Sequence, residues 1–254
     1  MNDKASRLTE ALVRRTERLT ESERDDSHPN QPPRDSATLI LIDRSGAAPK
    51  VLLGRRHHGH KFMPGKFVFP GGRVETADRR MPVATQLDAA TETRLMRSAQ
   101  RPSPDKARGY ALAAIRETFE ETGLLLGRKH HQSANAPNEH WAGYVAAGFL
   151  PDLEPMHFIA RAITPPRRIR RFDCRFFAAD ISDVAHRIEG VIGPDAELVE
   201  LVWIPLAEAR QLDLPMITEI VLEDLDARIA AGFRPDLPVP FYRWARGRFV
   251  RDLL

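Results

Sequence analysis

The stretch RETFEETG, residues 116–123, places an unusual concentration of charge on one short segment. One basic and three acidic residues fall within it: Arg116, Glu117, Glu120 and Glu121. Like charges one helical turn apart repel one another and destabilise an isolated helix. Some feature of the protein must therefore compensate the repulsion among these carboxylates.

The surrounding segment YALAAIRETFEETGLLL, residues 110–126, has the apolar spacing of a helix. Leu112, Ile115 and Phe119 recur at intervals of three and four residues, which places them on one helical face. With about 100° of rotation per residue, the three glutamates occupy a sector nearly opposite that face. Gly123 follows the pattern as a C-cap. We expect a helix that buries one side and presents three carboxylates from the other.

Two interpretations of these carboxylates are open at this point. The first is a solvated helix face, the common reason for a charge run, with Arg116 pairing with Glu120 one turn later. The second is a divalent-metal site, because carboxylate oxygens are preferred ligands of hard cations such as Mg²⁺ and Mn²⁺. The sequence upstream decides between them.

Upstream lies FVFPGGRVETAD, residues 67–78. Residues 67–69 have the composition of a strand end, and residues 70–72, Pro-Gly-Gly, that of a tight turn. Glycines at such a turn let the backbone approach a ligand or a metal ion closely.

The two segments together resemble the Nudix box, whose pattern is G-x5-E-x7-R-E-U-x-E-E-x-G-U with U aliphatic. Gly72 matches the first glycine, and residues 116–124 match the second half in register. The resemblance implies a Nudix hydrolase with an α/β fold, in which a mixed sheet lies between helices as an α/β/α sandwich.

The box departs from its pattern in three ways. Asp78 stands at the first glutamate, Thr118 occupies an aliphatic position, and residues 79–115 replace the seven-residue spacer. We expect a helix over residues 85–99 within this insertion. Because the cost of closing a loop grows slowly with its length, the two halves of the box can still meet in space. The alternative is a degenerate, inactive box, although every acid of the second half is intact.

A second likeness precedes the box, in LLGRRHHGHKFMPGKFVFPGG, residues 52–72. Nudix enzymes that cleave coenzyme A often carry L-L-T-x-R-[SA]-x3-R-x3-G-x3-F-P-G-G at this place. The matching residues are Leu52, Leu53, Arg56, Gly65, Phe69, Pro70, Gly71 and Gly72, and the departures are Gly54, His57 and Lys61. The chain is thus similar to the Nudix branch with an insertion inside the box, which includes the peroxisomal-type coenzyme A diphosphatase.

The resemblance implies a metal site and a catalytic role for the helix. Glu117, Glu120 and Glu121 would hold Mg²⁺ or Mn²⁺ ions, together with the backbone carbonyl of Gly72. Glu117 is also a candidate to orient or deprotonate the attacking water. Arg116 would hold the carboxylates in place.

The resemblance also implies a substrate site. Arg56, Lys61 and Gly71 would contact the substrate, and Asp78 would support the metal site from behind. The expected reaction is hydrolysis of CoA or acyl-CoA to 3′,5′-ADP and phosphopantetheine. Two alternatives stay open: a diphosphatase acting on ADP-ribose, NADH or a dinucleotide, and a Nudix-fold nucleotide-binding module without turnover.

Composition narrows the class of protein without choosing a substrate. The chain has 254 residues with 38 basic and 35 acidic side chains, a formal net charge of +3. This balance does not suggest a nucleic-acid partner. No apolar run reaches the length of a membrane span and no signal-peptide pattern is visible, so we expect a cytoplasmic protein with a small nucleotide as its partner. Cys174, the single cysteine, excludes an internal disulfide and is expected to be a packed thiol.

We expect residues 1–35 to be disordered and residues 36–254 to form the Nudix domain. The predicted elements are strands at 36–43 and 50–56, a polar loop at 127–139, a helix at 140–148, strands on either side of 167–171, a strand leading into a helix at 198–209, and an amphipathic helix at 216–231. The basic and aromatic tail, residues 239–250, either packs back on the domain or covers the site of a neighbour in a homodimer.

Further polar residues each have two interpretations. His57, His58 and His60 are either metal ligands or, as we favour, surface and substrate contacts. The basic run RRIRR, residues 167–171, is either a solvated edge, which we favour, or a phosphate contact. Glu197 or Glu200 supplies either a further metal ligand or base, or only surface charge.

Overall fold

Strand β1 (Arg34–Asp43) is the strand around which the fold is built. The structure is a computed structural model that describes residues 2–22, 25–60, 63–131, 134–234 and 236–254. β1 pairs with β8 (Phe172–Asp180) along one edge. Along its other edge it pairs first with β4 (Gly71–Arg73) and then with β2 (Lys50–Arg56). This change of partner brings the Gly71–Gly72 segment into the middle of the sheet.

The main sheet runs in the order β10-β2-β1-β8-β7-β11-β12, with β3 paired to β2 and β4 paired to β1. The pairs β1–β8 and β7–β11 are parallel and the others are antiparallel, so the sheet is mixed. Its remaining strands are β3 (Phe67–Val68), β7 (His157–Ile163), β10 (Leu198–Pro205), β11 (Pro240–Ala245) and β12 (Arg248–Leu253).

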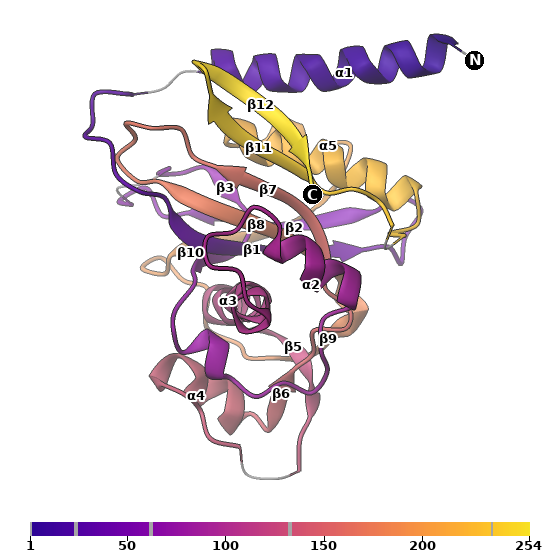
Figure 1. The fold of residues 1–254 in the computed structure, drawn as a ribbon. Coiled ribbons are helices and arrows are strands. Elements are labelled where there is room, and N and C mark those ends of the chain that lie inside the picture. Colours follow the sequence, from indigo (N-terminus) through magenta and orange to yellow (C-terminus); the bar gives the residue numbers. More distant parts are fainter. Residues whose placement is uncertain (1, 23–24, 61–62, 132–133, 235) are drawn as a thin grey trace.

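Helices cover both faces of this sheet (Figure 1). Helix α3 (Pro104–Thr122) lies on one side, whereas α5 (Met216–Ala230) and α1 (Asn2–Glu21) lie on the other. The prediction of an α/β/α fold with a mixed sheet is confirmed. Within the described part of the chain, no helix combines the length and the apolar character needed to cross a membrane.

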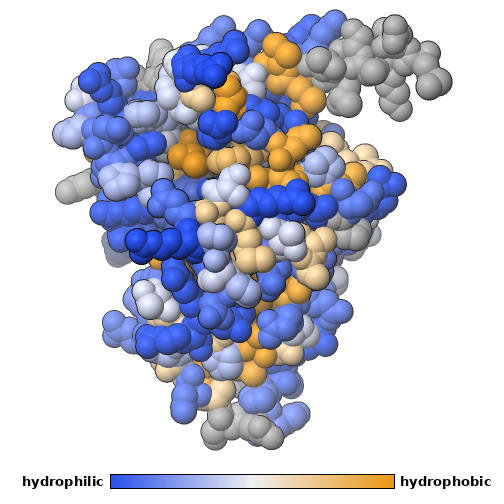
Figure 2. All heavy atoms as spheres, viewed as in Figure 1, coloured by the Kyte–Doolittle hydropathy of each residue, from blue (hydrophilic) through white to orange (hydrophobic). Residues whose placement is uncertain are grey.

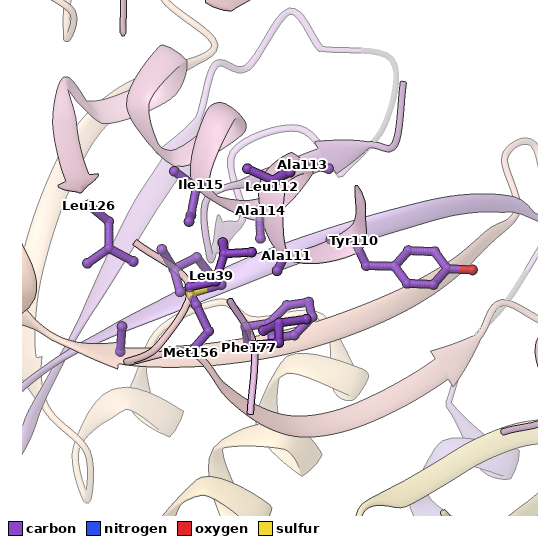
Figure 3. Close-up of a cluster of buried hydrophobic side chains, with 14 of the residues drawn as sticks. Leu39, Tyr110, Ala111, Leu112, Ala113, Ala114, Ile115, Leu126, Met156 and Phe177 are labelled. Carbon is purple, nitrogen blue, oxygen red and sulfur yellow. The ribbon is translucent and has the colours of Figure 1, made fainter. Parts of the chain in front are cut away.

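Alternate side chains of β1 point to opposite faces and divide the core in two. Leu39 and Leu41 pack with α3 in one cluster, which includes Leu39 of β1 and Ala111 and Ile115 of the helix (Figure 3). Ile40 and Ile42 pack with α5 in the other cluster. Hydrophilic residues cover most of the face drawn in Figure 2, which leaves only smaller apolar patches exposed there.

A second, smaller sheet extends the fold beyond α3 (Figure 1). It consists of β6 (Phe149–Pro151), β5 (Leu124–Lys129) and β9 (Val184–Arg187), in that order, and α4 (Glu139–Ala146) lies next to β6. The predicted polar loop at 127–139 therefore begins as strand. Its first residues continue β5, because Gly127, Arg128 and Lys129 pair with β6.

The insertion at 79–115 carries a shorter helix than predicted, α2 (Ala89–Met96). The Asp88 side chain begins it by accepting hydrogen bonds from the backbone N–H groups of Ala90 and Thr91, and Arg97 returns to extended backbone at its end. Arg161 of β7 donates to the carbonyls of Arg97 and Ser98, which ties the end of α2 to the sheet. The last part of the insertion is the first three turns of α3 itself.

The predicted strands and helices elsewhere agree with the structure to within a few residues. The tail, for which no element type was predicted, is largely a hairpin of β11 and β12 over residues 240–254. β11 pairs in parallel with β7, so the tail packs back on its own chain.

Residues 2–21 form helix α1, where the sequence pattern suggested disorder. The buried side chain of Leu19 anchors the helix in the core. Arg15 contacts Glu223 and Asp224 of α5 at 2.7 and 2.6 Å. Phe249 of β12 also donates its backbone N–H to the Thr20 hydroxyl. These partners lie more than 200 residues away in the sequence, so local polarity alone does not reveal them.

Replacing Arg15 by alanine should loosen α1 from α5. The change removes two ion-paired hydrogen bonds and leaves the buried Asp224 carboxylate with one partner fewer. We expect the free energy of unfolding in urea to fall by about 1–3 kcal/mol. Arg14→Ala, at an exposed position on the same helix, is the matched control. Equal unfolding curves for the two variants would contradict the docking of α1.

Candidate functional site

The last two turns of helix α3 carry the three predicted acids. It begins at Ser103, whose hydroxyl accepts from the backbone N–H of Lys106, with Pro104 at its first position. It ends at Gly123, which has a positive φ of 74° and caps the helix in the left-handed conformation that glycine favours. The predicted C-cap is thus confirmed, and it fixes the last two turns of α3 beside β4.

A buried ion pair joins the two halves of the split motif. Arg116 donates from Nε and Nη2 to the Asp78 carboxylate at 2.8 and 3.2 Å, and from Nη2 to the carbonyl of Arg73. Asp78 is fully buried and Arg116 is 2% exposed. Asp78 also accepts from the indole of Trp141 at 3.0 Å and from the backbone N–H of Glu75 at 2.7 Å. The insertion therefore leaves both halves of the motif in contact.

The same arginine holds two of the three predicted acids. Its Nη1 donates to Glu117 and to Glu120, both at 2.9 Å. The other Glu120 oxygen lies 2.8 Å from Nδ1 of His140, and this hydrogen bond raises the pKa of His140. Glu120 is thus held between Arg116 and His140, whereas neither residue holds Glu121.

Glu117 and Glu121 instead lie at the Gly71–Gly72 segment. Gly71 donates its backbone N–H to Glu121 at 3.1 Å, and only 7% of Glu121 is exposed. A Cβ atom on Gly72 would overlap the Glu117 carboxylate, so only glycine leaves room for this side chain as it is placed. The structure therefore brings Glu117 and Glu121 together, and we call them the acid pair. They lie against Gly71 and Gly72 of β4, the glycine strand.

The acid pair is electrostatically strained. Burial raises the pKa of Glu117 to about 7 against the opposing effect of Arg116, and Glu120 and Glu197 add to the rise. Burial also raises the pKa of Glu121 well above its usual range, and the next causes are the charges of Glu197 and Glu117. Glu197 is therefore a third carboxylate close enough to repel both members of the pair.

The structure separates the two late glutamates that the sequence left equivalent. Arg56 donates from Nη2 to Glu197 at 2.6 Å, next to the acid pair. Glu200 pairs with Arg55 at 2.7 Å and contributes to neither raised pKa. Glu197 is the late-domain acid of the site.

The donor set suits a hard divalent cation. In the part of the chain that the structure describes, no three carboxylate, imidazole or thiol groups are already arranged as a complete metal ligand set. Arg116 occupies one oxygen of Glu117. Glu117, Glu121 and Glu197 nevertheless offer only oxygen donors, and their mutual repulsion would be relieved by a cation. The residues present therefore fit a hard divalent cation.

A cleft of about 1150 Å³ opens beside these acids. Gly71, Gly72, Glu117, Glu197 and Arg56 line one end of it. The cleft continues over the sheet towards β7, β8 and the segment after α1. Its volume is slightly above the usual range for small-molecule sites, so it has room for an extended ligand.

The remaining predicted residues lie beside the arginines of β2 or outside the described residues. Lys61, the second predicted cationic contact, lies outside the described residues. His58 and His60 lie 3.2 and 3.1 Å from Arg55 and Arg56. Surface and substrate contact therefore remains the favoured interpretation of these histidines.

The basic run at 167–171 holds the segment after α1 in place. Arg168 donates to the carbonyl of Asp25, and Arg171 donates to the carbonyl of Gln31. Arg168 and Arg170 also line the far end of the cleft. The sequence pattern favoured a solvated edge for this run. The structure shows that it also forms part of the wall of the cleft.

Sequence reasoning missed His140, Trp141 and Arg73 as members of this site. Trp141 and His140 come from α4, and Arg73 contributes through its carbonyl. Only the tertiary packing of α4 against α3 reveals the first two. The third follows from the register of β4 beside β1.

Comparisons with known proteins support the pattern found in the sequence. No family model matches the chain. It is 26% identical over 166 residues to "Putative nudix hydrolase 7" of Caenorhabditis elegans, which covers 59% of this chain and 45% of the relative. It is 32% identical over 111 residues to the acyl-coenzyme A diphosphatase NUDT19 of Gallus gallus, covering 35% of this chain and 29% of the relative. The chain thus spans less than half the length of these curated relatives.

A solved structure gives the same indication for the fold. The crystal structure of a NUDIX hydrolase from Alicyclobacillus acidocaldarius superposes with a TM-score of 0.56 at 27% sequence identity. The match covers 78% of this chain and 92% of the other, so it includes the main sheet and is not confined to the motif.

The raised pKa of Glu117 predicts how stability depends on pH in metal-free protein. The folded state binds this proton more tightly than the unfolded state, where the pKa is near its usual 4.5. The resulting stabilisation is complete below pH 4.5 and is lost as the pH rises through 7, at most about 3 kcal/mol. In urea unfolding with EDTA, the stability of the wild type relative to Glu117→Gln should therefore be greater at pH 4 than at pH 8. A Glu117→Gln profile parallel to that of Glu139→Gln, an exposed control on α4, would refute the assignment.

Proposed function

The chain belongs to the Nudix hydrolase family, and on that basis we propose that it is a divalent-metal-dependent hydrolase of phosphoanhydride bonds in nucleoside diphosphates linked to a second group. The observation that carries this proposal is the buried acid pair Glu117–Glu121, whose member Glu117 lines a cleft of about 1150 Å³ together with Glu197. Three repelling carboxylates at a glycine strand are costly unless a cation or a proton compensates them.

The acids and the glycine strand would share the metal-binding role. Glu117, Glu121 and Glu197 would hold Mg²⁺ or Mn²⁺ with the backbone carbonyl of Gly72. When bound, such ions neutralise phosphate charge and lower the pKa of a coordinated water. Glu120 would reach the same place only after leaving Arg116 or His140, so we rank it below the other acids as a ligand.

Glu117 is the residue we propose to accept the proton of the attacking water. A general base works best when its pKa is near the operating pH, and burial raises the pKa of Glu117 to about 7. Arg116 holds one Glu117 oxygen at 2.9 Å, so the other oxygen takes either a cation or this proton. In the base role Glu117 is therefore not a metal ligand, and Glu121 and Glu197 hold the ions. Asp78 in turn fixes Arg116, and its role is positional.

Coenzyme A or acyl-CoA is the substrate that we propose, giving 3′,5′-ADP and phosphopantetheine. The matches within residues 52–72 and the likeness to an acyl-coenzyme A diphosphatase support this choice. Gly54, one departure from the coenzyme A pattern, has a structural reason that does not concern substrate. A Cβ atom at this position would overlap the side chain of Leu198 on the neighbouring strand β10.

Hydrolysis of ADP-ribose, NADH or a dinucleotide is the runner-up, because the acids act on the diphosphate that all these compounds share. His57 and the cleft as described do not distinguish these compounds from coenzyme A. A binding module without turnover is the alternative of another class. The intact acid pair argues against it, since simple binding of a nucleotide does not require strained carboxylates.

Cleavage by purified protein with Mg²⁺ or Mn²⁺ tests the proposal directly. The panel is CoA, acetyl-CoA, ADP-ribose, NADH and a diadenosine polyphosphate, with products identified by mass. We expect 3′,5′-ADP to form fastest from the coenzyme A compounds, and Glu121→Gln to lower turnover about 100-fold or more. Glu200→Gln, the same change outside the acid pair, should alter turnover by no more than about twofold.

The other outcomes each select an alternative. AMP formed from the remaining substrates with CoA intact would replace the coenzyme A assignment by the runner-up. Metal binding without turnover of any compound would favour the binding module.

Gly72→Ala tests the acid pair without touching a carboxylate. The new methyl group would overlap the Glu117 carboxylate, which is the mobile end of a side chain, so the protein should still fold while Glu117 is displaced. We expect the affinity for Mn²⁺, measured by calorimetry, to fall about tenfold or more with little change in melting temperature. Gly46→Ala, where the methyl group meets open space, is the control. Unchanged Mn²⁺ affinity in Gly72→Ala would remove Glu117 from the metal site.

A further inference from the structure

Three small polar side chains form the floor of the cleft next to the acid pair: Ser36 and Thr38 of β1 and Cys174 of β8. Ser36 and Cys174 are direct partners in the parallel β1–β8 ladder. Thr38 Oγ1 lies 3.4 Å from Cys174 Sγ. The three groups therefore form one contiguous polar patch on the sheet.

This patch interrupts an otherwise apolar face. The next side chains of β1 on the same face, Ile40 and Ile42, are buried under α5. A central strand covered on both faces is normally apolar throughout. Helix α5 covers the face at Ile40 and Ile42, and the cleft begins at Ser36 and Thr38.

Ser36 has an unmet hydrogen-bonding capacity. Its side chain is 4% exposed, and its hydroxyl has no hydrogen-bond partner within normal distance and angle limits among the described residues. The neighbouring Cys174 thiol, a weak hydrogen-bonding group, interacts with it but does not replace a full hydrogen bond. A buried hydroxyl without a partner is unfavourable, and native structures seldom retain one. Its place on the floor of an open cleft indicates that a ligand supplies the missing partner.

The strand register places this hydroxyl at a defined position relative to the acids. Thr38 is paired with Gly71, whose N–H holds Glu121, and an added Cβ on Gly71 would lie 2.5 Å from Thr38 Oγ1. Ser36 lies two residues further along β1, about 7 Å away. It is paired with Arg73, an exposed cation that lines the same cleft.

We propose that Ser36 and Thr38, with Cys174 beside them, form a subsite that hydrogen-bonds a neutral hydroxyl or amide group of the substrate immediately beyond its diphosphate. The subsite rests on the proposed function only in taking a diphosphate to bind at the acid pair. Hydroxyl groups both donate and accept, so they match a ribose hydroxyl or the first hydroxyl and amide of a pantetheine arm equally well. The test distinguishes these two sources.

Cys174, the only cysteine of the chain, reports on this floor without any need for turnover. Burial raises the pKa of its thiol, so labelling with methyl methanethiosulfonate is carried out at alkaline pH and followed by mass. The rate is measured in the Glu121→Gln variant with Mn²⁺, so that cleavage is slow and the diphosphate has a cation to bind. The added ligand is CoA, 3′,5′-ADP, 4′-phosphopantetheine or inorganic pyrophosphate. We expect CoA to slow labelling and pyrophosphate, which reaches only the acids, to have little effect. Protection by 3′,5′-ADP alone assigns the ribose, and protection by 4′-phosphopantetheine alone assigns the arm.

Substitutions then test the hydroxyl groups themselves. Ser36→Ala and Thr38→Val should each weaken CoA binding, measured by calorimetry, about threefold to tenfold. Ser36→Ala should leave the melting temperature unchanged or slightly raised, because it breaks no hydrogen bond of the protein. Ser45→Ala, the same change in an exposed turn outside the cleft, is the control.

Two results would overturn the subsite. One is protection of Cys174 by pyrophosphate equal to that by CoA. The other is an unchanged CoA affinity in Ser36→Ala, and this calorimetric result decides the matter even if the thiol reacts slowly. A protein that binds CoA through this floor but does not cleave it would retain the subsite while the proposed function fails.

Discussion

The buried ion pair between Arg116 and Asp78 is the interaction on which the site depends. A buried pair of charges is favourable only when further hydrogen bonds satisfy it, and here Trp141, Glu75 and the carbonyl of Arg73 do so. The pair fixes α3 against the turn that follows β4, and the same guanidinium then orients Glu117 and Glu120. A shorter carboxylate suffices at position 78 because the 3₁₀ turn at 78–80 places it directly against the arginine. The long insertion is tolerated because it leaves from this turn and returns as α3, so both of its ends are held.

Much of the fold could be predicted from the sequence because its elements carry strong local signals. The strand at 36–43 is a run of apolar residues, and α3 combines helical spacing with a proline near its start and a glycine at its end. The acids followed from the same helix, since their spacing fixes which side of α3 they occupy. That spacing did not predict the division of the acids into two groups. Glu120 separates from Glu121 because Arg116 and His140 hold it, and His140 comes from α4.

The parts that could not be predicted depend on contacts between distant segments. Residues 2–21 are polar and look disordered alone, yet Arg15 and Arg18 meet acids of α5 and Leu19 enters the core. The tail was ambiguous for the same reason, because β11 gains its partner only when β7 is already in the sheet. Glu197 and Glu200 are close in sequence and alike in type, so only their different arginine partners separate them.

The two faces of β1 serve different purposes, and this division explains where the cleft lies. The face of Leu39 and Leu41 packs on α3, which sets the height at which the acids meet the glycine strand. The opposite face is apolar at Ile40 and Ile42 and polar at Ser36, so α5 covers only its second half. Gly71 and Gly72 pair with Thr38 and Ala37 of β1, at the point where the helix α5 no longer covers the strand. Because Gly72 has no side chain, Glu117, which comes from the α3 side, has room to line the cleft that extends over the other side of the sheet.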